Sequence, residues 1–500
     1  MSQAHFESFS EVVRSHARTS PHRAAFVVGS RRVGWAELDR NADRIASQLR
    51  ESGLRPRDRV AALLSDPVEF LFGLFGTVRA SGVYVPLPGR LQSEALREFL
   101  RDCRPRFVLS DGSVPRLRGV TEQGFGTHVP VAASPFSAKT VRKRSSVRAE
   151  DEFSILYTSG STAQPKGIVH THGARYFSAR RDVAHFRLCR ESVALVATPL
   201  YTSMTWSVIL PVVLAGGTSV IVEPFTPGAI ADVLRVERVT LMKLVPTQYA
   251  MLLEDRAFPM RSLETLEWVL YSGAQASEKT KVTLRRLFPS SATEVYGASE
   301  CGPITYLQAH LAGKCGVGVP FPSVRIRILD ERGDVVPPAG GGAIAVSSPG
   351  LMLGYHRNAA ATRAAFWTEP STGRRFCRVG DIGSLDGQGC LWLGGRADDV
   401  IMSGGLKIHA RDIEQVLLRH EDVVEAAVVG APHRFLGESP VAFVVLRSGG
   451  SVDCAMLCAW TNARLNWYQR LQCVTRLDRL PTKSAGKVAK DALKRRHRRR

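Results

Sequence analysis

The sequence contains no run of about 18 consecutive apolar residues, the length that a helix needs to cross a membrane. Its most apolar stretch, from Phe70 to Val78, ends at Arg79 and is typical of a buried helix. The first residues lack a basic segment followed by an apolar one, so a secretory signal is not expected. These absences argue against a membrane as a partner.

Cysteine is sparse, and its spacing gives no sign of a metal site. The nine cysteines are scattered along the chain. Cys454 and Cys458 lie near each other, but no CxxC pair or His/Cys ligand spacing occurs. A reducing, cytoplasmic setting is the simplest expectation for such a chain.

Acidic residues are too few to balance the basic ones. The 67 lysines and arginines exceed the 46 aspartates and glutamates, and the net charge is +21. A basic surface can bind nucleic acid, an anionic membrane or an anionic cofactor. No zinc-finger, homeodomain or RNA-binding signature accompanies the charge, so nucleic acid is not expected as a partner. The terminal run Lys494–Arg500 predicts a solvated, disordered tail.

Helix and strand patterns alternate through most of the chain. With 44% hydrophobic and 23% charged residues, its 500 residues can form two or more globular domains. Residues 34–49 carry apolar side chains at helical spacing. Short apolar runs typical of strands occupy residues 59–64, 192–197, 219–222 and 266–271. This alternation predicts a layered α/β fold.

The pattern changes near Arg396. A helix is expected over residues 410–419, followed by strands over 423–429 and 441–446 and a final helix over 453–465. These shorter elements predict a separate α+β domain at the carboxyl end, of about a hundred residues.

One loop has the composition of a phosphate-binding site. From Tyr157 to Gly167 the sequence reads Tyr-Thr-Ser-Gly-Ser-Thr-Ala-Gln-Pro-Lys-Gly, directly after a short apolar strand pattern. Glycine lets the backbone approach an anion, hydroxyl groups donate hydrogen bonds, and lysine supplies charge. The Gly-x4-Gly-Lys-Ser/Thr spacing of P-loop NTPases is absent. Alone, the run is equally consistent with a surface turn that binds nothing.

Four further segments follow this loop in order. They are Tyr271–Gln275, Val295–Pro303, Arg378–Gly383 and Pro481–Lys487. Tyr296 offers a stacking face, Glu300 an oxygen ligand for a hard cation such as Mg²⁺, and Asp381 an acceptor for a ribose diol. Singly, each segment is more often a turn without function. Together and in this order, they are poorly explained by chance.

These motifs, with Gly-Arg-x-Asp-Asp at residues 395–399, resemble those of the acyl-adenylate-forming superfamily. That family includes acyl- and aryl-CoA synthetases, stand-alone adenylation domains and firefly-type luciferases, and the likeness covers essentially the whole chain. It implies an α/β fold with a large, multi-subdomain amino-terminal domain over residues 1–397. A small, mobile α+β domain over residues 398–500 is implied to pivot at Asp398. The implied reaction joins a carboxylic acid to AMP and then to a thiol.

The resemblance implies a role for each matching residue. For the phosphates these are Thr158, Ser159, Gly160, Ser161, Thr162 and Lys166; for adenine Gly273, Ala274, Tyr296 and Gly297; for the α-phosphate Ser299; for ribose Asp381 and Arg396. Glu300 and Thr162 are implied to hold Mg²⁺. Lys487 is expected to be the main catalytic side chain of adenylation, with Lys166 and Glu300 beside it. Gly404 and Gly405 are implied to line a thiol channel, in a segment otherwise typical of a plain hairpin turn.

Two residues depart from the family pattern. Ala163 stands where the phosphate loop usually has glycine, and a positive φ there would cost about 1 kcal/mol or more. Thr202 stands where many acyl-CoA synthetases have histidine; because it carries no charge, an acid without an α-amino group is expected. The expected acid pocket consists of Tyr201, Thr202, Met204, Trp206, Leu244, Ala298 and Ile304. Its aromatic and medium-sized apolar side chains suit an aryl or medium-chain acid, although any of them can equally be core.

The leading hypothesis is therefore an ATP- and Mg²⁺-dependent ligase that transfers an acid to coenzyme A. A close alternative loads the acid onto the phosphopantetheine of an acyl carrier protein. A non-enzymatic adenylate-binding protein is a third hypothesis; Ala163 favours it, whereas Lys166, Glu300, Asp381 and Lys487 argue against it. A luciferase-like activity has no sequence feature in its favour.

Overall fold

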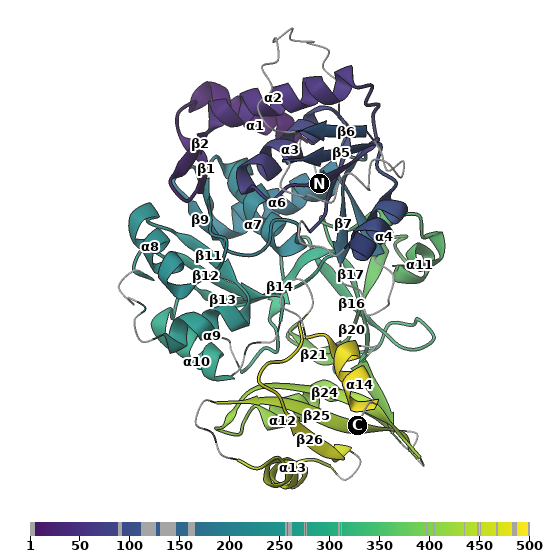
Figure 1. The fold of residues 1–500 in the computed structure, drawn as a ribbon. Helices are drawn as coiled ribbons and strands as arrows, with labels where there is room; N and C mark the ends of the chain where they lie inside the picture. The colour runs from purple at the N-terminus through teal and green to yellow at the C-terminus, as the bar shows by residue number, and fades with distance from the viewer. Residues whose placement is uncertain are drawn as a thin grey trace.

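The computed structural model describes most of the chain. The described residues are 6–88, 93–111, 127–130, 147–158, 166–255, 258, 263–274, 276, 278–308, 311, 313–396, 399–403, 406–434, 436–447, 450, 452–466, 469–482 and 488–498. Figure 1 shows a large body of helices and sheets above a smaller lobe that carries the carboxyl-terminal elements. This is the α/β class expected from the sequence. In the described ranges, no helix is long and apolar enough to cross a membrane.

A nine-stranded sheet runs through the large body. In spatial order its strands are β15 (Val319–Pro320), β14 (Gly302–Gln308), β13 (Ala292–Ala298), β12 (Trp268–Ser272), β11 (Leu241–Leu244), β9 (Val193–Val196), β10 (Thr218–Ile221), β1 (Ala24–Val28) and β2 (Arg31–Gly34). The strands from β13 to β1 pair in parallel, and antiparallel pairs close both edges. Their short apolar runs suit parallel strands that are buried on both faces.

A seven-stranded sheet forms a second layer. In spatial order its strands are β18 (Gly354–Tyr355), β8 (Lys166–Thr171), β7 (Glu152–Thr158), β4 (Val83–Pro86), β3 (Arg59–Leu63), β5 (Phe107–Ser110) and β6 (Thr127–Pro130). Strands β7 and β8 form an antiparallel hairpin, in which Thr158 pairs with Lys166. The expected phosphate loop therefore joins two central strands of this sheet.

Helices fill the space between the two sheets and cover their outer faces. One buried cluster joins both sheets to α1 (Phe9–Thr19), α2 (Trp35–Glu51), α3 (Pro67–Arg79), α6 (His172–Phe186) and α7 (Ser203–Ala215). A second cluster packs α8 (Pro227–Glu237), α9 (Pro246–Glu254) and α10 (Glu278–Leu287) on the other face of the nine-stranded sheet. A third packs α4 (Ser93–Cys103) on the seven-stranded sheet. The buried helix expected around residues 70–78 is confirmed as α3.

An antiparallel sheet leads from this body toward the small lobe. Its strands are β16 (Arg325–Leu329), β17 (Gly342–Ser347), β20 (Arg375–Leu385), β19 (Phe366–Thr368) and β21 (Leu391–Arg396), and α11 (Ala359–Ala365) precedes β19. Asp381 on β20 pairs with Arg396 on β21, so the two expected ribose-binding residues are cross-strand neighbours.

The small lobe is built on a separate sheet. Its elements are β22 (Val400–Ser403), β23 (Leu406–His409), α12 (Ala410–Leu417), β24 (Val423–His433), β25 (Gly437–Leu446), α13 (Cys454–Asn462), β26 (Cys473–Arg476) and α14 (Lys490–Arg498). One face packs with α12 and α13, and the other packs against Leu493 of α14. The expected α+β arrangement is confirmed here. The limits 1–397 and 398–500 stay predictions, and the hinge residue Asp398 lies outside the described residues.

The expectation of a disordered basic tail is wrong as far as Arg498. Residues Lys490–Arg498 form α14. The helix expected over residues 453–465, which is α13, is therefore not the final one. Leu493 is fully buried, and Lys490 pairs with Asp399 at 3.1 Å and with Glu414 at 2.8 Å. One apolar contact and two ion pairs thus hold a helix whose composition alone indicates a solvated segment.

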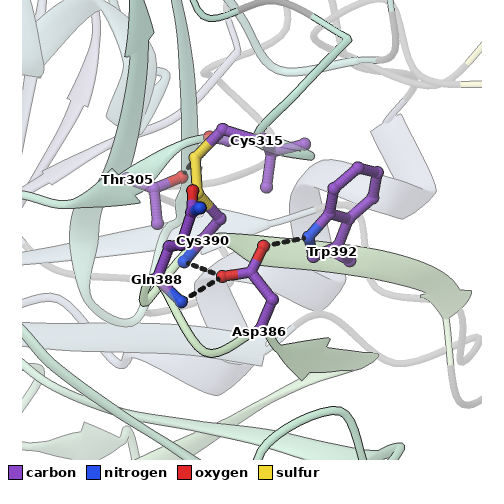
Figure 2. The surroundings of a disulfide bond; sticks show 7 residues. Thr305, Cys315, Asp386, Gln388, Cys390 and Trp392 are labelled. Atoms are coloured by element: carbon purple, nitrogen blue, oxygen red, sulfur yellow. Dashed lines mark hydrogen bonds between the residues drawn. A yellow bond between two sulfur atoms is a disulfide. The ribbon is translucent and has the colours of Figure 1, made fainter.

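A disulfide joins Cys315 to Cys390, which the sequence did not suggest because the two are separated by 75 residues. It connects the segment between β14 and β15 to the turn between β20 and β21, next to the Asp386 carboxylate, as Figure 2 shows. Asp386 accepts hydrogen bonds from two backbone N–H groups of its own turn and from the Trp392 indole. The cross-link therefore fastens the antiparallel sheet to the edge of the nine-stranded sheet.

Removing this cross-link is expected to lower the stability of the large body. Closing a loop of 75 residues contributes up to about 4 kcal/mol in the chain-entropy account. The double variant Cys315→Ser/Cys390→Ser should therefore unfold at a lower urea concentration than the wild type. Cys189→Ser, which removes an exposed free thiol, is the matched control. Identical midpoints for all three proteins would contradict a stabilising cross-link.

Candidate active site

The base of the phosphate loop is fixed by the β7–β8 hairpin. Tyr157 pairs with Gly167, and Thr158 with Lys166, so the two ends of the predicted loop are held side by side. The members of that loop, Ser159, Gly160, Ser161, Thr162 and Ala163, lie outside the described residues. Their predicted contacts with phosphate, and the effect of Ala163, stay predictions.

Glu300 and Lys166 meet around a residue that the sequence analysis missed. Glu300 Oε1 accepts a hydrogen bond of 3.0 Å from the Tyr355 hydroxyl, and Lys166 Nζ lies 5.9 Å from the centre of the Tyr355 ring. Burial and the neighbouring Glu300 carboxylate raise the pKa of Tyr355, so the hydroxyl stays protonated and donates. Tyr355 lies on β18, which pairs with β8. The two residues assigned to phosphate and Mg²⁺ thus both contact the same tyrosine.

The residues expected to bind adenine and ribose are also brought together. Tyr296 on β13 donates its hydroxyl to Asp381 Oδ2 at 2.6 Å, although 85 residues separate them. This contact joins the nine-stranded sheet to the antiparallel sheet. The carboxylate of Asp381 is therefore held next to the aromatic ring, as a site for a nucleoside requires.

Tyr296→Phe tests this contact. The variant keeps the ring but removes the donor to Asp381, and a hydrogen bond to a charged group contributes enough to change affinity about tenfold or more. We expect the KM for ATP to rise by that factor while the KM for the acid stays within about twofold. Initial-rate kinetics in both substrates measure this. A rise in the KM for the acid alone would place Tyr296 elsewhere in the site.

Two glycines shape the surface where a planar base would lie. Gly273 follows β12 with φ +90°, a conformation that favours glycine, and it is exposed. At Gly297 a Cβ atom would lie 2.8 Å from the carbonyl oxygen of Gly302, so a side chain there would displace the backbone. Ala274 and the half-exposed Ser299 lie in the turns beside them, and the Ser299 backbone hydrogen-bonds the buried His170 ring.

Several predicted site residues of the small lobe lie outside the described residues, although their neighbours in the sequence are described. Thr482 and Val488 form an antiparallel bridge on either side of the segment that contains Lys487, while Lys487 itself lies outside the described residues. Gly404 and Gly405 likewise lie outside them, and their neighbours Ser403 and Leu406 pair with each other. The side chain of Arg396 is not described either. These roles stay predictions.

The ion pairs of Lys490 connect the start of α14 to Asp399, the residue after the predicted hinge, and to α12. Lys490 lies three residues beyond Lys487, and its ammonium bridges Asp399 and Glu414. Burial alone would lower the pKa of Lys490, but the two carboxylates outweigh it and raise that pKa. Sequence spacing gave no signal for this contact, because the partners are distant along the chain.

The expected acid-pocket residues do not all face one space. Trp206 and Ile304 are buried in the cluster between the sheets, whereas Leu244 packs on the opposite face of the nine-stranded sheet with α8 and α9. Tyr201, Met204 and Ala298 are half-buried. Thr202 is the N-cap of α7, accepting from the Thr205 N–H and donating to the Pro199 carbonyl at 2.9 Å. The threonine therefore has a structural role at the position where relatives commonly have histidine.

The donor set fits a magnesium ion held chiefly by phosphate oxygens. Among the described residues, no group of three or more His, Cys, Asp or Glu side chains converges on one point. Glu300 uses one carboxylate oxygen for Tyr355 and keeps the other, which suits a cation that takes one or two carboxylates together with substrate phosphates.

The profile of the AMP-binding enzyme family matches residues 13–356, and that of the AMP-binding enzyme C-terminal domain matches residues 412–487. The chain belongs to the AMP-binding enzyme family. The resemblance noted from its motifs is thereby confirmed. Among curated relatives, a feruloyl-CoA synthase from Amycolatopsis sp is 33% identical over 96% of this chain and 97% of its own length. An indoleacetate–CoA ligase from Aromatoleum aromaticum is 31% identical, over 96% of each chain.

Solved structures of this family have the same two-part arrangement. ATP-bound MatB from Rhodopseudomonas palustris superimposes with a TM-score of 0.87 at 27% identity, covering 98% of this chain and 99% of its own. MenE from Bacillus subtilis, solved with ATP and a magnesium ion, gives 0.86 at 28% identity, covering 97% and 99%. Apo MatB gives only 0.76 over the same coverage. The arrangement of this chain is therefore closer to the ATP-bound form.

Proposed function

We propose that this AMP-binding enzyme activates an aryl carboxylic acid with MgATP and transfers the acyl group to coenzyme A. The broad class, an AMP-forming acid–thiol ligase that uses ATP, Mg²⁺ and CoA, is confirmed by relatives that match almost the whole chain. The aryl preference rests on three relatives above 30% identity, of which two are named for feruloyl-CoA and one for indoleacetate. The observation that carries the proposal is the convergence of Lys166, Glu300 and Tyr355.

This convergence explains how the chain would support the first half-reaction. Attack of a carboxylate on the α-phosphorus of ATP moves negative charge onto the phosphate oxygens, and fixed donors stabilise such charge best when they are already in position. Lys166 supplies positive charge at the base of the phosphate loop. Among the described residues, the second carboxylate oxygen of Glu300 forms no hydrogen bond and would be available to Mg²⁺, and the Tyr355 hydroxyl fixes the orientation of the carboxylate. When bound, Mg²⁺ would neutralise the charge of the departing pyrophosphate.

For the second half-reaction we propose a pivot of residues 398–500 at Asp398. The β22–β23 hairpin with Gly404 and Gly405 would then replace the Lys487 turn beside the acyl group, and CoA would reach it. Coenzyme A rather than a carrier protein is the proposed acceptor, since the relatives above 30% identity are named for CoA. We place the enzyme in the cytoplasm, where ATP and CoA are available. The Cys315–Cys390 disulfide is unusual for that reducing compartment, and both of its cysteines are almost fully buried.

The proposal is tested by incubating the enzyme with ATP, Mg²⁺, CoA and single acids. The panel comprises cinnamic, benzoic, indoleacetic and medium-chain acids. Acyl-CoA, AMP and pyrophosphate should form in equal amounts, and fastest with an aryl acid. Faster turnover of a medium-chain acid would overturn the aryl assignment, and product formation only with a phosphopantetheinyl carrier protein would overturn the acceptor.

A further inference from the structure

Two adjoining small cavities lie between α6, α7 and the nine-stranded sheet. Their walls share Asp182, Ser207 and Pro303. Trp206, one of the residues expected to form the acid pocket, lines the second cavity, and so does Gly302, which lies two residues beyond Glu300. The cavities therefore adjoin the expected acid pocket. An acid that enters with its carboxylate near Glu300 would direct its other end toward them.

The wall of the deeper cavity carries a buried lysine. Lys243 is on β11, where alternate residues face opposite sides, so it faces α6 and α7 while Leu244 faces α8 and α9. Its ammonium donates one hydrogen bond, of 2.7 Å, to Ser207 Oγ, and that hydroxyl donates in turn to the Met204 carbonyl at 2.6 Å. Among the described residues, Lys243 forms no ion pair. Burial lowers the pKa of Lys243 to about 8.

The surrounding charges compensate this lysine only in part, because burial and Arg181 lower the pKa of Lys243 while Asp182 raises it. Asp182 is bound by its neighbour Arg181 at 2.7 Å, so that pair is close to neutral. Arg175 lies over the Trp206 ring at 5.1 Å, and its hydrogen bonds among the described residues go to the neutral side chains of Ser154 and His170, while its Nε atom has no partner there. The lining thus holds more positive than negative charge.

A purely structural role does not account for this arrangement. An unpaired buried charge is unfavourable, and an apolar side chain of the same length would fill the position at lower cost. Lysine with open hydrogen-bond capacity on a cavity wall is instead what a ligand with an acceptor oxygen requires.

We propose that Lys243, with Ser207 beside it, binds an oxygen substituent at the end of the acid remote from the reacting carboxylate. Two kinds of substituent would provide such an oxygen, a phenolic hydroxyl or a second carboxylate, and both would accept a hydrogen bond from Lys243. This inference rests on the proposed function, because it concerns the acid of that same reaction. It makes Lys243 a residue that sets substrate specificity and leaves ATP binding to other parts of the site.

The test compares three acids with the same cinnamic skeleton: cinnamic, 4-hydroxycinnamic and 4-carboxycinnamic acid. Hydrogen bonds to a charged group change affinity about 10- to 100-fold. The wild type should therefore show a kcat/KM higher by that factor for at least one oxygen-bearing acid than for cinnamic acid. The preferred member of the pair identifies the source of the oxygen. Equal values for all three acids would overturn the inference.

Lys243→Met keeps the length of the side chain and removes the charge. We expect it to reduce the advantage of the oxygen-bearing acid to within about threefold, with an unchanged KM for ATP and a melting temperature equal to or above that of the wild type. Ser207→Ala should reduce the advantage partially. Lys279→Met, which removes an exposed lysine of α10, is the matched control. A Lys243→Met enzyme with wild-type acid preference would contradict the proposal.

Thermal shift in the presence of AMP decides the inference independently of turnover. The oxygen-bearing acid should raise the melting temperature of the wild type but not that of Lys243→Met. If no acid yields acyl-CoA, the proposed function fails, and this difference still supports the lysine site. If acyl-CoA forms but the difference is absent, the lysine site alone fails.

Discussion

Lys487→Ala is expected to lower acid-dependent pyrophosphate release by about 10²- to 10³-fold, the usual effect of losing one preorganised donor. Thiolysis of synthetic acyl-AMP by CoA should continue near the wild-type rate. The reason is that the lysine turn would serve only adenylation, whereas the β22–β23 hairpin would serve thiol transfer. Separate assays of pyrophosphate release and of acyl-CoA formation from added acyl-AMP measure the two steps.

A matched control for this variant is Arg495→Ala, which removes an exposed positive charge from α14. It should leave both half-reactions unchanged. The Thr482–Val488 bridge and the Lys490 ion pairs involve residues other than Lys487, so Lys487→Ala should leave these contacts intact. Equal loss of both half-reactions in Lys487→Ala would contradict the account of two conformations.

Glu300→Gln is expected to lower the kcat of adenylation about 10²-fold and to raise the Mg²⁺ concentration needed for half-maximal rate. The amide keeps the shape and can still accept the Tyr355 hydrogen bond, so the loss is one of charge at the metal. Initial rates of pyrophosphate release over a range of Mg²⁺ concentrations measure both effects.

Tyr355→Phe separates charge from orientation. It leaves the Glu300 carboxylate charged but removes the hydroxyl that holds it, and loss of such an outer contact typically costs 10- to 100-fold in metal affinity or activity. We expect an effect near the lower end of that range. An unchanged Mg²⁺ dependence in Glu300→Gln would place the ion elsewhere, and full activity of Tyr355→Phe would remove the tyrosine from the site.

Local patterns predicted the elements of the fold well where periodicity was strong. The helix expected over residues 34–49 is α2, and the apolar runs at 192–197 and 219–222 are β9 and β10. The carboxyl-terminal tail was mistaken because its charge concealed one buried leucine, Leu493, and the ion pairs of Lys490. Those contacts depend on tertiary neighbours, which composition does not encode.

The site was predicted unevenly for the same reason. Turn motifs suggested Tyr296, Glu300 and Asp381 as site residues, whose roles stay predictions, and the structure brings Tyr296 and Asp381 into contact. Tyr355 could not be found, because it meets Glu300 only through strand pairing between β18 and β8. Strict alternation along Leu241–Leu244 was the available signal that Leu244 and Lys243 face opposite sides of the sheet.

The disulfide shows a further limit of sequence analysis. Cys315 and Cys390 have no distinctive spacing, and they become neighbours only because the edge of the nine-stranded sheet packs against the β20–β21 turn. Pairing of cysteines cannot be deduced from sequence alone when the bridged segments belong to different sheets.

The central claim is that the carboxylate of the acid attacks the α-phosphorus of ATP. It is tested most directly with an aryl acid labelled with ¹⁸O in both carboxylate oxygens, in the presence of ATP, Mg²⁺ and CoA. Mass spectrometry should find one ¹⁸O atom in each AMP formed, with one acyl-CoA for each AMP. Unlabelled AMP, or ADP with the label in inorganic phosphate, would contradict an acyl-adenylate intermediate.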